Sequence, residues 1–246
     1  MTRKILLSFT GAALLSAFLV ACSDSGTSAK DSFDASVVCP IEGVNAYGEP
    51  NRGTFTDARD GKVYKYTTIG NQMWMAENLN FEVSYSYSEC DSNIETPCDG
   101  LGRYYSLYIK RTKPGFANTT EFNRDLADTI CPIGWHVPTT DDWCVLYNNM
   151  GGDGGESGDR KVSLRLKSTS VFGEFPMGTD VCGFNILPRF TWSENPEPHY
   201  RFSTPTFWTS TLLDLETVYM FSVGADEVNF FEANTFFMRP LRCVRD

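Results

Sequence analysis

Alternating β-prone and polar residues near the start of the globular part of the chain predict two hairpins. In residues 54–81 the β-prone positions stand on both sides of Asp60-Gly61, a dipeptide typical of tight hairpin turns. A second turn is expected at Gly70-Asn71, and the apolar run 73–75 that follows is typical of a short strand. This part of the chain is therefore expected to begin a β-meander.

The same kind of pattern returns at the end of the chain. From Phe207 onward, four β-prone runs follow one another, and turns are expected at 224–226 and 233–235 between the later ones. Pro240 lies in the last run and cannot donate a hydrogen bond to a ladder. We therefore expect an edge or a bulge at this position.

Helical periodicity is found in the middle of the chain. Residues 140–150 carry four apolar residues at helical spacing, which form one stripe: Trp143, Leu146, Tyr147 and Met150. Thr139 or Thr140 can cap this helix, and Gly151-Gly152 ends it. A second short helix is expected from about Glu121, because apolar residues recur there every four positions.

The order of these elements predicts the fold class. Strands early, a helix in the middle and strands late are typical of an α+β domain with antiparallel sheets, one or two short helices and long loops. Residues 53–246 are enough for one sizeable core and hardly enough for two, so we expect a single compact domain.

The first 22 residues have the pattern of an export signal. Arg3 and Lys4 precede an uncharged run over residues 5–20, and Ala21 then leads to Cys22. The run is shorter than the roughly 20 apolar residues that a spanning helix needs. The alternatives are an uncleaved membrane anchor, or an ordinary cleaved signal that is followed by an incidental cysteine.

The tetrapeptide Leu19-Val20-Ala21-Cys22 argues against both alternatives. It resembles the lipobox of bacterial lipoproteins, in which the cysteine thiol takes a diacylglycerol and becomes the first residue. This resemblance predicts a signal peptide over residues 1–21 and lipid attachment at Cys22. Ser23, rather than Asp, follows the cysteine, which in such lipoproteins favours the outer membrane. Residues 22–52 are interpreted as a lipidated flexible tether and an N-terminal extension.

Charge excludes one class of partner. The chain has 31 Asp and Glu against 21 Lys and Arg, a net charge of −10. Removal of residues 1–21 takes away two bases and no acid, which makes the mature chain more acidic still. Such a surface repels phosphate backbones, so nucleic acid is not an expected partner. It offers no polybasic contact to anionic lipid either, so the acyl chains must provide the membrane contact.

Cysteine usage agrees with export to an oxidising compartment. Lipidation of Cys22 leaves an odd number of cysteines, and no two of them have the spacing of a zinc knuckle. The expected disulfides are Cys90–Cys98, Cys131–Cys243 and Cys144–Cys182, which leaves Cys39 over.

A series of motifs along the chain resembles one family. In order they are FTDARDGKVYKYTTIGNQMWMAENLNF, GRYYSL, CPIGWHVPTTDDW, LRLKST, GFNILPRF, FWTST and the terminal LRCVRD. On these motifs residues 53–246 are identified as a member of the Fibrobacter succinogenes major paralogous domain family. Its members resemble one another as exported or lipid-anchored envelope proteins, and the family implies no shared reaction. Cys144 and Cys182 both depart from the family pattern, which favours pairing them.

The layout more distantly resembles the C-type-lectin-like fold, which also underlies formylglycine-generating enzymes. That resemblance implies that a long loop region, residues 151–206, carries the binding surface. Calcium-dependent lectins use a Glu-Pro-Asn-like and a Trp-Asn-Asp-like triplet; residues 194–198 echo only the first, so no such site is expected. Formylglycine-generating enzymes rely on a cysteine pair in the catalytic cleft, whereas here Cys182 and Cys243 are far apart in sequence.

Two candidate sites are weighed against structural roles. His136 precedes the central helix, but the sequence marks no partner acid or nucleophile near it, so a structural role at a tight turn is expected. The stretch 151–159 offers Asp153, Glu156 and Asp159 as oxygen ligands for Ca²⁺. It lacks the spacing of a known calcium loop and is expected to be a solvated acidic loop. No metal or cofactor is therefore expected.

Residues 190–208 form the candidate binding surface. Aromatic, amide and charged residues alternate with prolines in this expected loop, and exposed rings beside carboxylates and amides suit a polysaccharide or a protein partner. The alternative is that these rings close the core under a long loop. The candidate ligand-binding residues are Trp192, Glu194, Asn195, His199, Tyr200 and Arg201.

Together these patterns predict a lipid-anchored protein of the outer membrane that acts as a non-catalytic binding module, for polysaccharide at the cell surface. A structural or protein-interaction role in the envelope is the alternative. An enzyme of the formylglycine-generating type is the less favoured reading. The chain shows no Ser-His-Asp order or nucleophile elbow, so no enzymatic activity is expected.

Overall fold

Antiparallel sheets dominate the computed structural model, which confirms the α+β class. The structure describes Cys22 and residues 33–83, 88–90, 98, 100–111, 119–154, 156–170, 177–187, 189–193, 199–235 and 237–246. These residues form four short helices, rather than one or two. In this part of the chain no helix is both long enough and apolar enough to span a bilayer.

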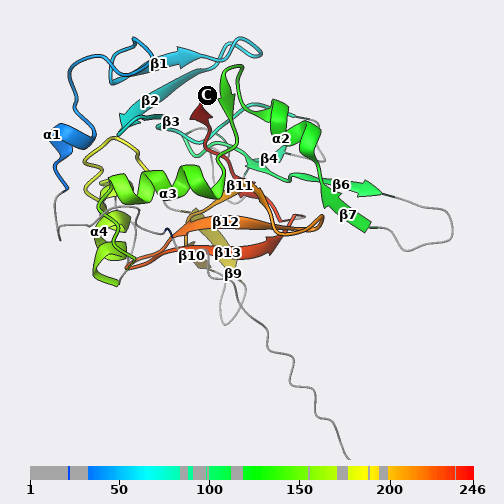
Figure 1. Ribbon diagram of the computed structural model, residues 1–246. Helices are drawn as coiled ribbons and strands as arrows, with labels where there is room; N and C mark the ends of the chain where they lie inside the picture. The colour runs from blue at the N-terminus through cyan, green and yellow to red at the C-terminus, as the bar shows by residue number, and fades with distance from the viewer. Residues whose placement is uncertain are drawn as a thin grey trace, which may run out of the picture.

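The early hairpins form one sheet together with the end of the chain. The strand order is β1-β2-β3-β15-β8, and Figure 1 shows the C-terminal end of the chain beside β2 and β3. β15 therefore pairs with two strands that come much earlier in the sequence. The strands are β1 (Arg52–Thr56), β2 (Val63–Ile69), β3 (Gln72–Met75), β8 (Trp135–His136) and β15 (Val244–Arg245).

The β-prone runs after residue 205 form a three-stranded sheet in the order β11-β12-β13. Ala233 and Asn234 extend the last of these strands because they pair with Val218 and Thr217, so the turn predicted at 233–235 is wrong for its first two residues. The strands are β11 (Thr206–Leu212), β12 (Thr217–Val223) and β13 (Val228–Asn234).

Short strands complete the sheets. Pro240 lies in a strand at the edge of the sheet β14-β5-β4, as its missing N–H predicts. The strands β6 and β7 form a separate pair. The bounds are β4 (Ser88–Glu89), β5 (Tyr104–Tyr105), β6 (Tyr108–Arg111), β7 (Thr119–Phe122) and β14 (Arg239–Pro240).

The predicted central helix is α3 (Thr140–Asn149), and Thr139 caps it. The Thr139 hydroxyl accepts a hydrogen bond from the Asp142 N–H, and the Asp142 carboxylate accepts one from the Thr139 N–H, which together form a capping box. α2 (Arg124–Ile130) begins later than predicted, because Glu121 pairs in β7 instead.

A further helix, α4 (Glu156–Leu166), corrects the loop predicted over 151–159. The last four residues of that stretch are helical. Val162 and Leu166 lie four residues apart and are fully buried, so they fix the helix to the core. α1 (Ala35–Val38) is a single turn near the N-terminus.

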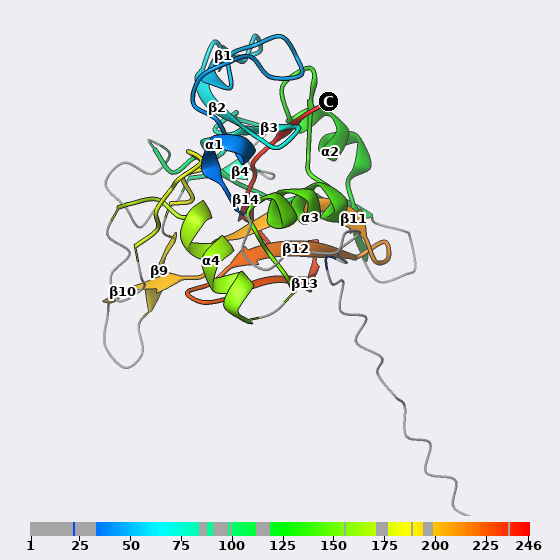
Figure 2. The ribbon, with the colours of Figure 1, turned by 60° about the vertical axis from the view of Figure 1, so that its left-hand side comes forward.

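The β11-β12-β13 sheet separates two hydrophobic clusters. Phe207 and Phe221 belong to the cluster that α3 and α4 cover, whereas Trp208 and Met220 belong to the cluster on the opposite face. Figure 2 shows α3 lying along this sheet. Trp143 of α3 stacks on Phe221 with ring centroids 4.2 Å apart, at the centre of the first cluster.

Two expected disulfides, Cys90–Cys98 and Cys131–Cys243, are present in the structure. The expected pair Cys144–Cys182 is wrong, and so is the expectation that Cys39 is left over. Cys182 pairs with Cys39, and Cys144 pairs with Cys22.

The N-terminal segment explains these pairings, because from residue 33 it packs on the domain. The Val38 carbonyl accepts a hydrogen bond from the Gly70 N–H at 2.7 Å. Arg52 donates to the carbonyls of Cys39 and Val181 at 3.5 and 3.0 Å. These contacts bring Cys39 to the segment that contains Cys182.

Candidate binding groove

The residues predicted to bind ligand lie on a hairpin, so the expected loop is corrected. β9 (Arg189–Ser193) and β10 (His199–Ser203) pair antiparallel, with Trp192 opposite Tyr200 and Arg201 opposite Thr191. The β-prone residues on both sides of residues 194–198 pair with each other, a tertiary pairing that the alternation with prolines did not indicate. Glu194 and Asn195 lie outside the described residues.

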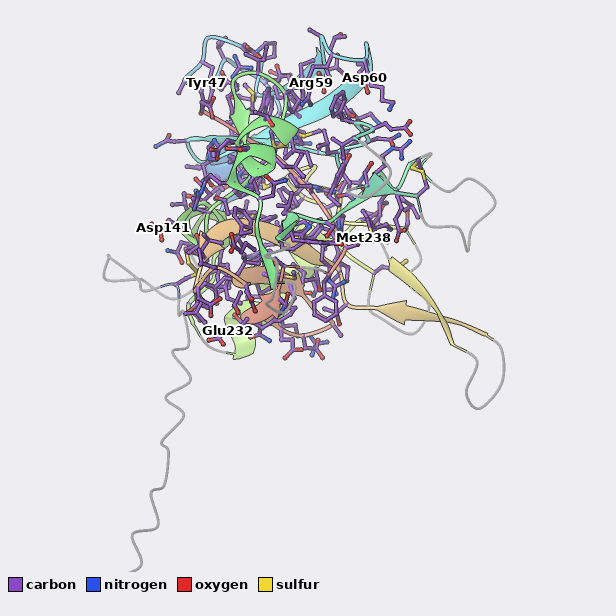
Figure 3. The ribbon with its side chains drawn as sticks, turned by 90° about the vertical axis from the view of Figure 1, so that its right-hand side faces the viewer. Tyr47, Arg59, Asp60, Asp141, Glu232 and Met238 are labelled. Carbon is purple, nitrogen blue, oxygen red and sulfur yellow. A yellow bond between two sulfur atoms is a disulfide. The ribbon has the colours of Figure 1, made fainter. Side chains whose placement is uncertain are left out.

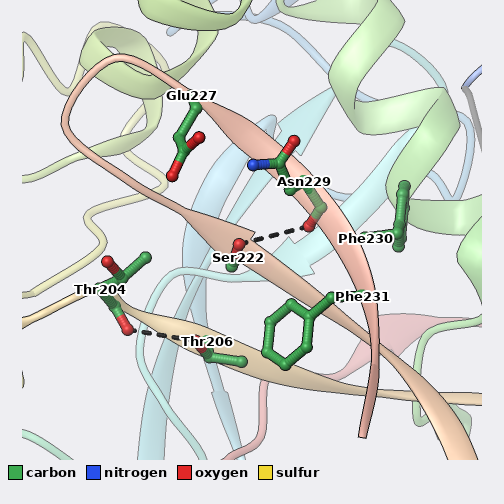
Figure 4. Close-up of a pocket in the computed structure, with 7 residues that line it drawn as sticks. All are labelled: Thr204, Thr206, Ser222, Glu227, Asn229, Phe230 and Phe231. Carbon is green, nitrogen blue, oxygen red and sulfur yellow. Dashed lines mark hydrogen bonds between the residues drawn. The ribbon is translucent and has the colours of Figure 1, made fainter. Parts of the chain in front are cut away.

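Directly after this hairpin, the chain enters an open groove on the β11-β12-β13 sheet. Its volume is about 520 Å³. Figure 4 shows the strands that carry its walls. The described lining residues are Thr204, Thr206, Ser222, Glu227, Asn229, Phe230 and Phe231.

A row of polar residues crosses the floor of the groove. Thr206 lies opposite Ser222, and Ser222 lies opposite Asn229, so the three side chains share one face of the sheet. Thr206 and Ser222 are buried, and Asn229 is exposed. The Thr206 hydroxyl donates to the Thr204 carbonyl at 3.1 Å, and the Ser222 hydroxyl donates to the Asn229 carbonyl at 3.4 Å. Both hydroxyl oxygens therefore retain acceptor capacity toward a ligand.

In the next row on the same face of the sheet, the Phe231 ring lies at the groove. Phe231 lies opposite Met220, which lies opposite Trp208. Trp208 and Met220 are buried, but Phe231 is 39% exposed. Phe230 packs on the opposite face of the sheet, against the cluster under the helices, and Figure 4 shows it pointing away from Phe231.

The turn that carries Glu227 is held in place from α4. The Gly224 N–H donates to the Glu227 carbonyl at 2.8 Å, which closes the turn. Ser163 and Lys167 both donate to the Gly224 carbonyl, at 2.6 and 2.9 Å. Burial lowers the pKa of the Lys167 ammonium, and the nearby Asp226 opposes this effect. The backbone from which the Glu227 side chain projects is therefore fixed by a hydrogen-bonded turn.

The groove offers unsatisfied polar groups beside an apolar ring. Among the described residues, none hydrogen-bonds the Asn229 amide or the Glu227 carboxylate, and Glu227 is the one charged group of the lining. Asn229 and Phe231 were not among the binding residues predicted from the sequence. They stand two residues apart in a β-prone run, a spacing that places side chains on one face of a strand. The register that aligns them with Ser222 and Thr206 could not be deduced from the sequence.

The comparisons with known proteins identify the family. The model of the Fibrobacter succinogenes major domain matches residues 67–245. The chain belongs to this family. No curated protein and no solved structure matches, so the likeness to C-type lectins stays a prediction.

Asp159, one of the residues considered as a calcium ligand, is held by a hydrogen bond within this Fibrobacter succinogenes major domain. Asp159 accepts a hydrogen bond from the Tyr147 hydroxyl, which itself accepts one from the Gly154 N–H at 3.0 Å. Burial raises the pKa of Asp159. The described residues contain no group of three acidic, histidine or cysteine side chains that could hold a metal ion.

His136 of the Fibrobacter succinogenes major domain joins the C-terminus to the capping box of α3. Its Nδ1 lies 2.7 Å from an Asp246 carboxylate oxygen, and its Nε2 lies 3.3 Å from an Asp142 carboxylate oxygen. The hydrogen bond to Asp142 is the main cause that raises the pKa of His136, with a further contribution from Asp246 and opposition from burial. The two carboxylates orient the ring, as expected for a structural histidine.

This arrangement predicts that stability falls as the pH rises past neutrality. The folded-state pKa of His136 is raised, so its contribution is complete below the unfolded pKa near 6.5 and is lost as the pH passes the folded value. We expect the Tm of the wild type to fall between pH 6 and pH 8, and that of His136→Gln to change less. His199→Gln is the matched control and should keep the wild-type dependence. Equal profiles for wild type and His136→Gln would contradict the prediction.

Proposed function

We propose that this protein is a lipid-anchored envelope protein whose domain binds polysaccharide, without catalysis, in the groove on the β11-β12-β13 sheet. The observation that carries the proposal is the exposed Phe231 ring beside the Asn229 amide and the Glu227 carboxylate, which hydrogen-bond no described residue, together with a floor of hydroxyl groups.

The groove has the chemistry that saccharides require. An exposed ring can cover the C–H face of a pyranose, and it buries a large area with little loss of side-chain freedom. The Asn229 amide can donate and accept at once, and the Glu227 carboxylate accepts from neighbouring hydroxyl groups. The hydroxyls of Thr206 and Ser222 lie in the same row as Asn229. An open groove suits a segment within a long chain better than an enclosed small molecule.

The lipid anchor rests on the lipobox-like sequence at residues 19–22. The structure pairs Cys22 with Cys144. One sulfur atom can form either this disulfide or a thioether to diacylglycerol. We propose that the thioether forms in the mature protein, and that Cys144 then carries a free thiol.

Phe231→Ala is expected to reduce retention on polysaccharide about tenfold, because the ring supplies most of the apolar contact. The measurement is retention of the full chain, extracted in mild detergent, on cellulose, xylan and mannan. Phe237→Ala is the matched control, since Phe237 is 42% exposed and lies outside the groove lining. It should bind like the wild type.

Retention on none of the glycans would contradict the proposal and favour the protein-interaction alternative. Cross-linking in intact cells would then identify the partner. Equal losses in Phe231→Ala and Phe237→Ala would also contradict the proposal, because they would place the contact outside the groove.

A further inference from the structure

The described lining of the groove contains an acidic group and no base. Among its described lining residues, Glu227 is charged and the others are neutral. We infer that the groove selects uncharged polysaccharides and rejects those that carry carboxylate groups. This inference rests on the proposed binding function and specifies its ligand class.

The Glu227 side chain is held close to the turn from which it projects. A Cβ atom added to Gly224 would lie 2.7 Å from Glu227 Cγ, so the glycine leaves the space that this side chain occupies. Ser163 and Lys167 fix the same turn from below through the Gly224 carbonyl. The backbone of Glu227 is therefore fixed beside the groove, and its exposed side chain projects from a hydrogen-bonded turn.

Among the described residues, no cation pairs with the Glu227 carboxylate. Asp226, the preceding residue, pairs with Arg160 at 3.3 Å, but both side chains are 61% exposed, so the pair is largely screened by solvent. The buried Lys167 ammonium hydrogen-bonds carbonyls of the turn rather than the Glu227 carboxylate. Negative charge also dominates the whole chain, with a net charge of −10.

The charge of Glu227 acts differently on the two classes of ligand. A neutral sugar donates hydroxyl hydrogen bonds to the carboxylate, so this contact favours binding. A uronate brings a second carboxylate near the first, and like charges placed together at a binding surface oppose association. The discrimination is therefore expected to weaken at high salt.

Matched polymer pairs test this inference. The full chain is run in affinity electrophoresis against hydroxyethyl and carboxymethyl cellulose, and against methyl-esterified and de-esterified polygalacturonate. The wild type should be retarded at least fivefold more by the neutral member of a pair. Glu227→Gln should lose most of this preference through stronger binding to the charged member. Glu232→Gln removes the same charge from an exposed position of β13 outside the groove lining (Figure 3). This variant should keep the wild-type preference for the neutral polymer.

The outcomes separate the inference from the proposed function. If Phe231→Ala abolishes binding but the wild type prefers neither member of each pair, the groove binds glycan and the selection inference is wrong. The inference is also wrong if Glu227→Gln and Glu232→Gln change the preference equally. If the wild type is retarded by no polymer, both the inference and the proposed function fail.

Discussion

Cys22→Ser is expected to move the protein from the membrane pellet to the soluble envelope fraction. In the lipidated form the anchor is the acyl chains on Cys22, and each buried methylene contributes roughly 0.8 kcal/mol to membrane binding. Their loss should lower the membrane-bound share more than about a hundredfold, because the acidic chain has no polybasic surface to replace them. The measurement is fractionation followed by immunoblotting.

The number of free thiols shows whether the Cys22 sulfur carries the lipid or forms the disulfide. If Cys22 is lipidated, the extracted wild type should take one alkyl group under denaturing, non-reducing conditions, at Cys144. Cys144→Ser is the matched control: it should stay in the pellet and take none. The opposite result would be a soluble wild type that has no free thiol and in which a disulfide links the peptides containing residues 22 and 144. It would show that the disulfide of the structure is the mature state.

Arg242→Met is expected to lower the free energy of unfolding by about 3 kcal/mol. The Arg242 side chain is 1% exposed and donates to Asn78 Oδ1 from Nε and Nη2, at 3.2 and 2.8 Å. It also donates to the carbonyls of Phe184 and Asn185. Burial lowers the pKa of Arg242 to about 9, so the group remains cationic at neutral pH. Methionine supplies apolar volume but no donor, and it leaves these acceptors without a partner.

Thermal unfolding followed by circular dichroism measures this effect, and a Tm about 10 °C below that of the wild type is expected. Arg160→Met is the matched control. Its side chain is 61% exposed and, among the described residues, pairs with Asp226, so less than about 1 kcal/mol should be lost. Equal Tm values for the two variants would show that the acceptors around Arg242 find other partners.

Local patterns predicted most of the fold. The hairpin at Asp60-Gly61 and the capped helix after Thr139 depend on neighbouring residues, which a sequence displays directly. The start of α2 was misplaced because Glu121 pairs across to Ile109 in β6. That pairing is a tertiary contact, and local periodicity does not contain it.

The candidate site was less predictable because it depends on register and long-range contact. Residues 190–208 include Thr204 and Thr206, so the predicted surface touches one wall of the groove. Asn229 and Phe231 come from a strand later in the chain. They reach the groove only because β12 lies between β11 and β13. The Cys39–Cys182 pair was missed for a similar reason, because the N-terminal extension folds back onto the domain.

The place of β15 in the five-stranded sheet bears on when the domain can complete its fold. This strand inserts between β3 and β8, and Cys243, next to it, closes the disulfide to Cys131. If the chain is exported as proposed, its N-terminus emerges first, so β3 and β8 stay unjoined until β15 has crossed the membrane. In that case the sheet closes only after β15 has been translocated, and a chain that stalls before this strand is expected to expose two open sheet edges to proteases.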